Sequence, residues 1–187
     1  VDAGGLAEAV EAVARLNSSV EELFALELEP PGTLLLRLGG IESVLPARIQ
    51  RLRALLDLPC ELVDDEEDCW RREGEFSWAS RDDSFVKIPA TLAVIEALDS
   101  HLDELGAVRR YGCGGSVAWV CWPAGESFEK LEELLLNVGT TGLILWHSAD
   151  SSAGPLLNRK EGPFEGRIRS VLDGPGTFSI HPSRREP

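Results

Sequence analysis

The sequence predicts an α+β fold in which helices cover one face of a mostly antiparallel sheet. From Gly112 to Trp146 the chain runs through an apolar strand, an amphipathic helix and a second apolar strand, separated by turn residues. Similar strand and helix patterns precede this stretch. Residues 22–29 and 33–38 are strand-like and are joined by a Pro-Pro-Gly turn, which is typical of an antiparallel hairpin. Strands joined both by hairpins and by helices favour the α+β class.

The first third of the chain predicts a helix, a hairpin, a second helix and a returning strand. An apolar stripe at steps of three and four predicts a lead-in helix within residues 1–20. Residues 22–29 alternate between apolar and acidic side chains, whereas 33–38 is more continuously apolar and is expected nearer the sheet centre. A helical stripe over 41–56 and an apolar run at 58–63 complete the unit.

The second half predicts two more strand, helix, strand units. Its expected elements are strand 84–89, helix 92–105, strand 107–111, strand 117–122, helix 128–138 and strand 141–146. Ser127 is a suitable N-cap and Gly139 a suitable C-terminal stop for the last helix. Three such units predict a doubled ferredoxin-like sheet. A Rossmann fold is the weaker alternative, because residues 112–115 lead into a strand and no GxGxxG motif precedes a helix.

We predict a single domain, residues 1–187. Two of its segments do not follow the strand and helix pattern. Residues 64–83 mix dense acid with Trp70, Phe76 and Trp78, which predicts an irregular segment. It is either a solvated helical turn and loop whose two tryptophans cover the edge of the core, or a mobile flap that lays an aromatic ring over a ligand pocket. Residues 155–187 are expected to form a C-terminal helix and tail.

Composition excludes several classes of partner. A net charge of −14 disfavours binding to nucleic acid and to anionic membrane surfaces. No run of about 20 apolar residues predicts a membrane span. The four cysteines show neither a zinc-knuckle spacing nor a disulfide framework, which predicts a reducing, cytoplasmic location. A start at Val1 and the lack of methionine suggest a fragment of a longer protein.

The catalytic patterns are weak. His147 lies near Ser148 and Asp150, but no GxSxG elbow accompanies them, so a hydrolase triad is disfavoured. Cys113 and Cys121 could join His147 in a zinc site, although buried structural cysteine is the simpler interpretation. We therefore predict no catalytic residue and no metal ligand.

Lys87 is the most informative charged residue, because it interrupts an otherwise apolar strand that is expected at the centre of the sheet. One interpretation is that the lysine extends along the outer face of the sheet to reach water. The other is that it offers a cation to a carboxylate in a pocket.

Several strings, taken together in order, resemble one protein family. They are EDCWRR around Trp70, FVKIP at Phe85–Pro89, YGCGGSVAWV at Tyr111–Val120 and RIRSVLDGPGTFSIHP at Arg167–Pro182. The chain resembles the C-terminal cap domain of FAD-linked oxidases of the vanillyl-alcohol oxidase type, most closely the FAD-binding subunits of bacterial glycolate oxidases. The likeness spans roughly the last 120 residues.

The resemblance implies a division of labour. FAD would be held by an N-terminal domain absent from this chain, and the cap would shape the pocket for a small 2-hydroxy acid above it. Lys87 would be the carboxylate partner, at a position where the family usually has arginine. Trp119 and Trp70 would be pocket walls, with ordinary core packing as the alternative. Further oxidase subunits, including an iron–sulfur subunit, would carry electrons onward, and the chain alone would be inactive.

Departures from the family pattern leave a second class of function open. Thr140 and Thr141 follow Gly139 where the family has a Gly-Gly-His step, Gly174 replaces the proline of an Asp-Pro pair, and His181 falls in the altered Asn-Pro-Gly turn. These changes lie where a cap would meet flavin. The alternative is a non-catalytic α+β binding or assembly module derived from the same fold.

Overall fold

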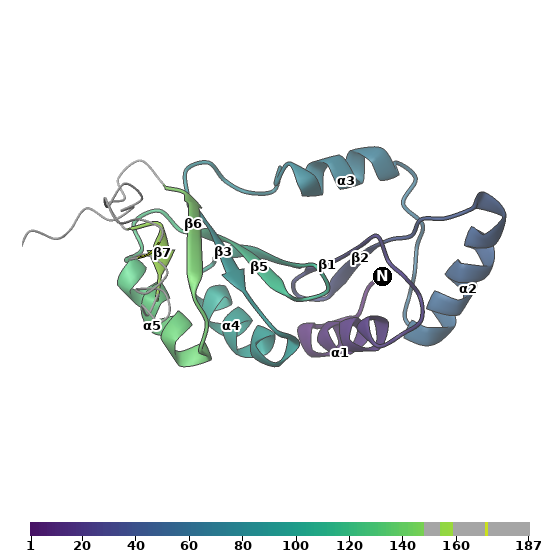
Figure 1. The fold of residues 1–187 in the computed structure, drawn as a ribbon, viewed down its shortest axis with the longest axis horizontal. Coiled ribbons are helices and arrows are strands. Elements are labelled where there is room, and N and C mark those ends of the chain that lie inside the picture. The colour runs from purple at the N-terminus through teal and green to yellow at the C-terminus, as the bar shows by residue number, and fades with distance from the viewer. Residues whose placement is uncertain (148–153, 159–170, 172–187) are drawn as a thin grey trace, which may run out of the picture.

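The computed structural model describes residues 1–147, 154–158 and 171, and in that part of the chain it forms one seven-stranded sheet (Figure 1). The strand order is β2-β1-β4-β5-β3-β6-β7, and every neighbouring pair is antiparallel. Helices α1, α4 and α5 lie along one face, and α2 lies beyond β2 at one end. The predicted α+β class is confirmed.

Residues 84–146 form a complete ferredoxin-like unit. Its strands lie in the order β4-β5-β3-β6, with one helix after β3 and another after β5. The elements are β3 (Ser84–Pro89), α4 (Leu92–Glu104), β4 (Val108–Gly112), β5 (Val117–Trp122), α5 (Phe128–Val138) and β6 (Gly142–Trp146). The short β7 (Leu156–Leu157) extends the sheet beyond β6.

Residues 1–60 repeat the same chain path with reduced outer strands. The regular elements are α1 (Leu6–Asn17), β1 (Ala25–Glu29), β2 (Thr33–Arg37), the 3₁₀ turn η1 (Glu42–Val44) and α2 (Leu45–Leu56). Where the second unit has the strands β3 and β6, the first unit has only short backbone contacts. Asp2 bridges Thr33, and the Asp2 amide donates to the Pro59 carbonyl at 3.1 Å. The sheet is therefore two ferredoxin-like units joined edge to edge through β1 and β4.

Three sequence-based expectations for the first unit need correction. The strand expected nearer the sheet centre, β2, is the outermost one, because β1 and not β2 pairs with β4. The returning strand expected at 58–63 does not form, since Leu62 and Val63 are 68% and 53% exposed and lack a neighbouring strand with which to pair. The helix expected as a lead-in is instead an integral layer of the core, with Ala9, Val13 and Leu16 buried. The described strands thus group into two units rather than three.

The segment 64–83 contains a nine-residue helix, α3 (Glu66–Gly74), which is longer than the helical turn expected there. The Asp65 carboxylate accepts a hydrogen bond from the Asp68 amide at 3.0 Å, which caps its N-terminus. Acidic residues fill the first turn and Arg71 and Arg72 the last, the arrangement that suits the helix dipole. This helix lies on the face of the sheet opposite α1, α4 and α5 (Figure 1).

The hydrophobic core fills the layer between the sheet and the row of helices α2, α1, α4 and α5. Side chains alternate along each strand, so that Leu26 and Leu28 of β1 and Val120 of β5 face this layer. One buried charge lies within it. Asp99 of α4 accepts hydrogen bonds from Arg109 at 2.6 and 2.7 Å and from the Tyr111 hydroxyl at 2.8 Å. The negative charge of Asp99 is therefore balanced by Arg109, and both carboxylate oxygens accept hydrogen bonds.

The remaining predictions concern the membrane and the C-terminus. Among the described residues, no helix has the length and apolar character needed to cross a bilayer. The C-terminal helix and tail expected at 155–187 lie almost wholly outside the described residues, apart from 154–158 and Val171.

Candidate functional site

The sheet face opposite the core carries the charged and aromatic side chains that sequence alternation places there, and we call it the open face. Lys87 of β3 pairs with Trp119 of β5, which in turn pairs with Arg110 of β4. Residues directly opposite on antiparallel strands point to the same side. Glu27 and Glu29 of β1 continue this row toward the first unit.

A pocket of about 250 Å³ lies between the open face and the segment 66–79, and we call it the aromatic pocket. Its sheet side is formed by β1, β4 and β5, and its roof by α3 and the turn after it. The lining residues that carry rings or charges are Glu27, Arg37, Trp70, Glu73, Phe76, Trp78, Arg110 and Trp119. The segment 66–79, which we call the flap, therefore lies over this pocket.

Aromatic contacts attach this flap to the sheet. The Phe76 ring centroid lies 4.9 Å from that of Phe85 and 4.9 Å from that of Trp119. Trp78 adds an edge-on contact with Phe85 at 5.8 Å. No residue of α3 is fully buried. The flap thus depends on a few rings and ion pairs, and local opening is expected to cost less than global unfolding.

Arg110 links the sheet, the flap and the first unit. Its Nη1 donates to Glu29 Oε2 at 2.5 Å, and its guanidinium lies 5.2 Å from the Trp78 ring centroid. Its Nε lies 3.4 Å from Glu73 Oε2 on α3, an ion pair without hydrogen-bond geometry. The Arg110 side chain is only 12% exposed, so its charge acts in a poorly solvated site.

Two carboxyl groups of the aromatic pocket have raised pKa values. Burial raises the pKa of Glu27 to about 7, with a further increase from the negative charge of Glu73. The pKa of Glu73 is also raised, mainly by burial. A Cβ at Gly112 would lie 2.5 Å from Glu27 Oε2 and 2.9 Å from Trp119 Nε1. Glycine at this position therefore makes room for the carboxylate beside the indole.

The arginines of the aromatic pocket already have acidic partners. Arg37 pairs with Glu66, and Arg110 pairs with Glu29 and Glu73. The raised pKa of Glu27 leaves that carboxyl partly protonated near neutral pH. The rings supply apolar walls for a small organic acid.

Two of the three predicted binding residues meet in this pocket. Trp70 of α3 and Trp119 of β5 both line it. Lys87 does not line it but lies on the next strand, with its Nζ 5.3 Å from the Trp119 ring centroid. In the described part of the chain, no carboxylate lies within ion-pair distance of Lys87, so this half-buried cation remains available to a ligand.

The weaker sequence patterns gain no support. Among the described residues no group of histidine, cysteine and acidic side chains could hold a metal ion. Cys113 is exposed in the turn between β4 and β5, whereas Cys121 is buried on β5. Ser148 and Asp150, which would complete a triad with His147, lie outside the described residues, as do Gly174 and His181.

One departure from the family pattern has a visible structural role. The Thr140 hydroxyl donates to the Pro89 carbonyl at 2.7 Å, which ties the start of β6 to the end of β3. Thr141 is exposed beside it.

Sequence reasoning missed Arg110, Glu27 and Glu73. A usable signal was the Arg109-Arg110 pair inside a strand, because alternation must place one of these arginines on each face of the sheet. Glu27 lies in a strand that alternates apolar and acidic residues, and ordinary solvent exposure was the simpler expectation. Only the position of the flap reveals its burial.

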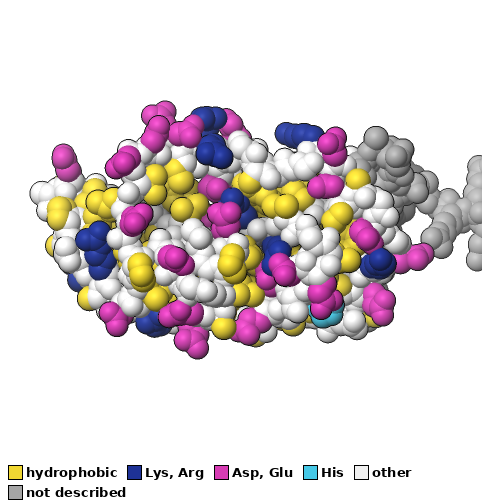
Figure 2. Space-filling view, turned by 180° about the vertical axis from the view of Figure 1, so that it is seen from behind, with side chains coloured by type: hydrophobic (Ala, Val, Ile, Leu, Met, Phe, Trp, Pro, Cys, Tyr) yellow, Lys and Arg dark blue, Asp and Glu magenta, His cyan; other side chains and the backbone are white. Residues whose placement is uncertain are grey.

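Comparison of the chain with protein-family models, with curated proteins and with solved structures found no match. The surface itself carries the acidity seen in the composition. Figure 2 shows Asp and Glu side chains spread over the visible face, with Lys and Arg side chains between them and apolar side chains exposed among both.

Proposed function

We propose that this chain is the cap domain of a flavin-dependent 2-hydroxy-acid oxidase subunit, where it shapes the substrate pocket above FAD held by another domain. The observation that carries the proposal is the open face. Trp119 and Arg110 on this face line the aromatic pocket beneath Trp70 of the flap. Lys87 lies on the next strand beside Trp119 and makes no ion pair among the described residues. A small acid needs a cation for its carboxylate and apolar walls for its carbon atoms, and these residues offer both.

Lys87 and Arg110 would divide the work of recognition. Lys87 is free of carboxylate partners, so it would bind the substrate carboxylate as a point charge. Arg110 is committed to Glu29 and Glu73 and would position the flap. Trp119 stands between the two cations and would form the wall that they share.

FAD is expected on another domain because the described residues do not offer a dinucleotide phosphate site. The glycine-rich stretch 112–115 forms the turn between β4 and β5 and therefore presents no helix N-terminus to a pyrophosphate. The two-electron chemistry would come from the flavin ring, and this chain would bind the acid, orient it and exclude water.

The test uses the complete protein that contains this chain together with its flavin domain. Glycolate and D-lactate are titrated without oxygen, and bleaching of the flavin absorbance is measured. We expect Lys87→Ala to weaken the apparent affinity for the acid by roughly 10- to 100-fold, because a hydrogen bond to a charged group is lost. Lys87→Arg should retain most of the affinity.

Lys130→Ala is the matched control, since Lys130 lies on α5, away from the open face, and pairs with Glu126. It should leave the titration unchanged. Absence of bleaching by any 2-hydroxy acid in a protein that retains flavin would reject the oxidase proposal.

One observation favours a second function, that of a non-catalytic binding or assembly module. Leu143 and Leu145 on β6 are 37% and 45% exposed. Leu143 pairs with Lys87, so the apolar surface borders the candidate site. A partner domain could cover these leucines whether or not chemistry takes place there. A stable complex with a flavin-free partner, lost in Leu143→Asp, would favour this role.

A further inference from the structure

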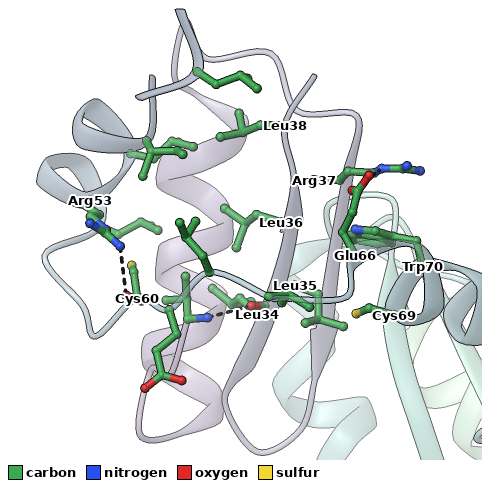
Figure 3. A pocket seen from close by; sticks show the side chains of 18 residues that line it. Leu34, Leu35, Leu36, Arg37, Leu38, Arg53, Cys60, Glu66, Cys69 and Trp70 are labelled. Carbon is green, nitrogen blue, oxygen red and sulfur yellow. Dashed lines mark hydrogen bonds and ion pairs between the residues drawn. The ribbon is translucent and has the colours of Figure 1, made fainter. Parts of the chain in front are cut away.

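A second cavity lies at the outer end of the sheet, between β2, α2 and the chain that leads into α3 (Figure 3). Its volume is about 260 Å³. Leucine, isoleucine and valine side chains make up most of its lining, and we call it the leucine cavity. It shares Arg37 and Trp70 with the aromatic pocket, but its other lining residues are separate from that pocket.

The path of the first unit explains why this space is not filled. In the second unit, α5 is followed by β6, and Leu135 of that helix packs directly over Gly142 of that strand. In the first unit, the residues after α2 form no strand, so α2 overhangs the edge of the sheet (Figure 1). As a result Leu36 of β2 and Ile49 of α2 face the hollow and stay only half-buried.

The lining sets the kind of ligand. An apolar cavity of ~150 Å³ takes one benzene ring, so on that scale 260 Å³ accommodates roughly ten carbon atoms. Water gains few hydrogen bonds against leucine walls, which favours an apolar occupant.

The rim adds a charge that has no counter-ion within the described residues. Arg53 of α2 lines the cavity, is half-buried, and makes one long hydrogen bond, from Nη2 to the Cys60 carbonyl at 3.4 Å. Arg37, at the other side of the rim, already pairs with Glu66 at 3.5 Å. Figure 3 shows Arg53 at the α2 side of the cavity, with its guanidinium turned toward Cys60. A guanidinium with unused donors is suited to a carboxylate.

We propose that the leucine cavity binds an amphipathic carboxylic acid, with an apolar part of about ten carbon atoms inside the cavity and its carboxylate on Arg53. Glu61 also lines the rim but is exposed to water, so its charge is better screened than that of Arg53. A medium-chain fatty acid and a bicyclic aromatic acid share this chemistry, and the experiment distinguishes them.

The test is calorimetric titration of the 187-residue chain with decanoate, 2-naphthoate and the neutral 1-nonanol, with leucine methyl NMR to locate the contact. We expect the methyl resonances of Leu36 and Leu52 to shift. Arg53→Gln should weaken decanoate binding about tenfold or more, through loss of a charged hydrogen bond, and should leave nonanol within twofold. The better ligand of the two acids identifies the chain or ring form.

Two filling variants check the location. Ile49→Trp and Leu36→Phe occupy the cavity from opposite walls, and either one, shown folded by circular dichroism, should abolish binding of all three compounds. Arg72→Gln, an exposed arginine on α3 outside the lining, is the matched control and should bind as the parent chain does. Absence of binding by both acids, or unchanged binding in a folded filling variant or in Arg53→Gln, would overturn the proposal.

Discussion

At the scale of single residues, Glu27 is a carboxyl group whose burial links stability to pH. Its pKa of about 7 in the folded chain exceeds the ordinary value of 4.5. Between these two values the folded state keeps a proton that the unfolded state has released. The free energy of unfolding therefore falls as pH rises through this window. Above about pH 7 the folded chain bears the full destabilisation from the buried, charged Glu27 carboxylate.

We predict that Glu27→Gln removes this pH dependence, because the amide stays neutral. From pH 5 to pH 8 the parent chain should lose on the order of 2 kcal/mol more stability than the variant, since one pKa unit corresponds to about 1.4 kcal/mol and Glu27 is only partly shielded from water. Urea unfolding at both pH values measures the difference. Glu22→Gln, at an exposed glutamate, should follow the parent. Equal slopes for parent and Glu27→Gln would contradict the burial argument.

At the scale of elements, the flap formed by residues 66–79 contacts the sheet through the Phe76 ring, among other contacts. We predict that Phe76→Ala raises the hydrogen-exchange rate of the α3 amides at least about tenfold. The exchange rates of the β3 and β5 amides should stay unchanged, because local opening is separate from global unfolding. Mass-detected hydrogen exchange gives both values.

Phe24→Ala is the control for this element, since that phenylalanine is 71% exposed and makes none of the ring contacts described for Phe76 and Trp78. If α3 exchanged at the parent rate in Phe76→Ala, the ion pairs of Arg110 and Arg37 would be sufficient to hold the flap, and the ring contacts would be incidental.

Regular elements with a strong period could be predicted from the sequence, and elements that depend on distant partners could not. The hairpin at Pro30–Gly32 and the helix that ends at Gly139 follow from local turn and capping chemistry. The apolar run 58–63 resembles a strand, but a strand also needs a hydrogen-bonded neighbour. The bond from the Asp2 amide to the Pro59 carbonyl is the only backbone–backbone hydrogen bond described for residues 58–63.

The same distinction applies to the candidate site. Lys87 could be selected because it breaks an apolar strand, and Trp70 and Trp119 do line one pocket. The roles of Glu27 and Glu73 could not be predicted, because both depend on α3 crossing β1 and β4. These strands lie more than 30 residues before and after α3 in the chain. Long-range placement of a flap leaves no local pattern.

At the scale of the whole molecule, the two ferredoxin-like units share one core. Leu28 of β1 is 1% exposed and pairs with Tyr111 of β4 at the junction. A continuous core under the joined sheet predicts one cooperative unfolding transition for both units.

We predict that Leu28→Ala destabilises the chain by about 2–5 kcal/mol through the cavity that it leaves. All five tryptophans lie at position 70 or later, so tryptophan fluorescence reports on the second unit and the flap, whereas Leu28 belongs to the first. The fluorescence and far-ultraviolet circular dichroism midpoints in urea should fall together. A fluorescence midpoint equal to that of the parent, with a biphasic dichroism curve, would show that the units unfold independently.

The neighbouring arginines of β4 have a consequence for how this sheet assembles. Arg109 meets Asp99 and Asp103 on the helix side, whereas Arg110 meets Glu29 and Glu73 on the opposite side. A slip of β4 by a single residue would turn each guanidinium away from its acids, leaving unbalanced charges in both layers at once. The two adjacent arginines therefore favour one register of β4 and destabilise registers shifted by a single residue. This disfavours mispairing where the two units join.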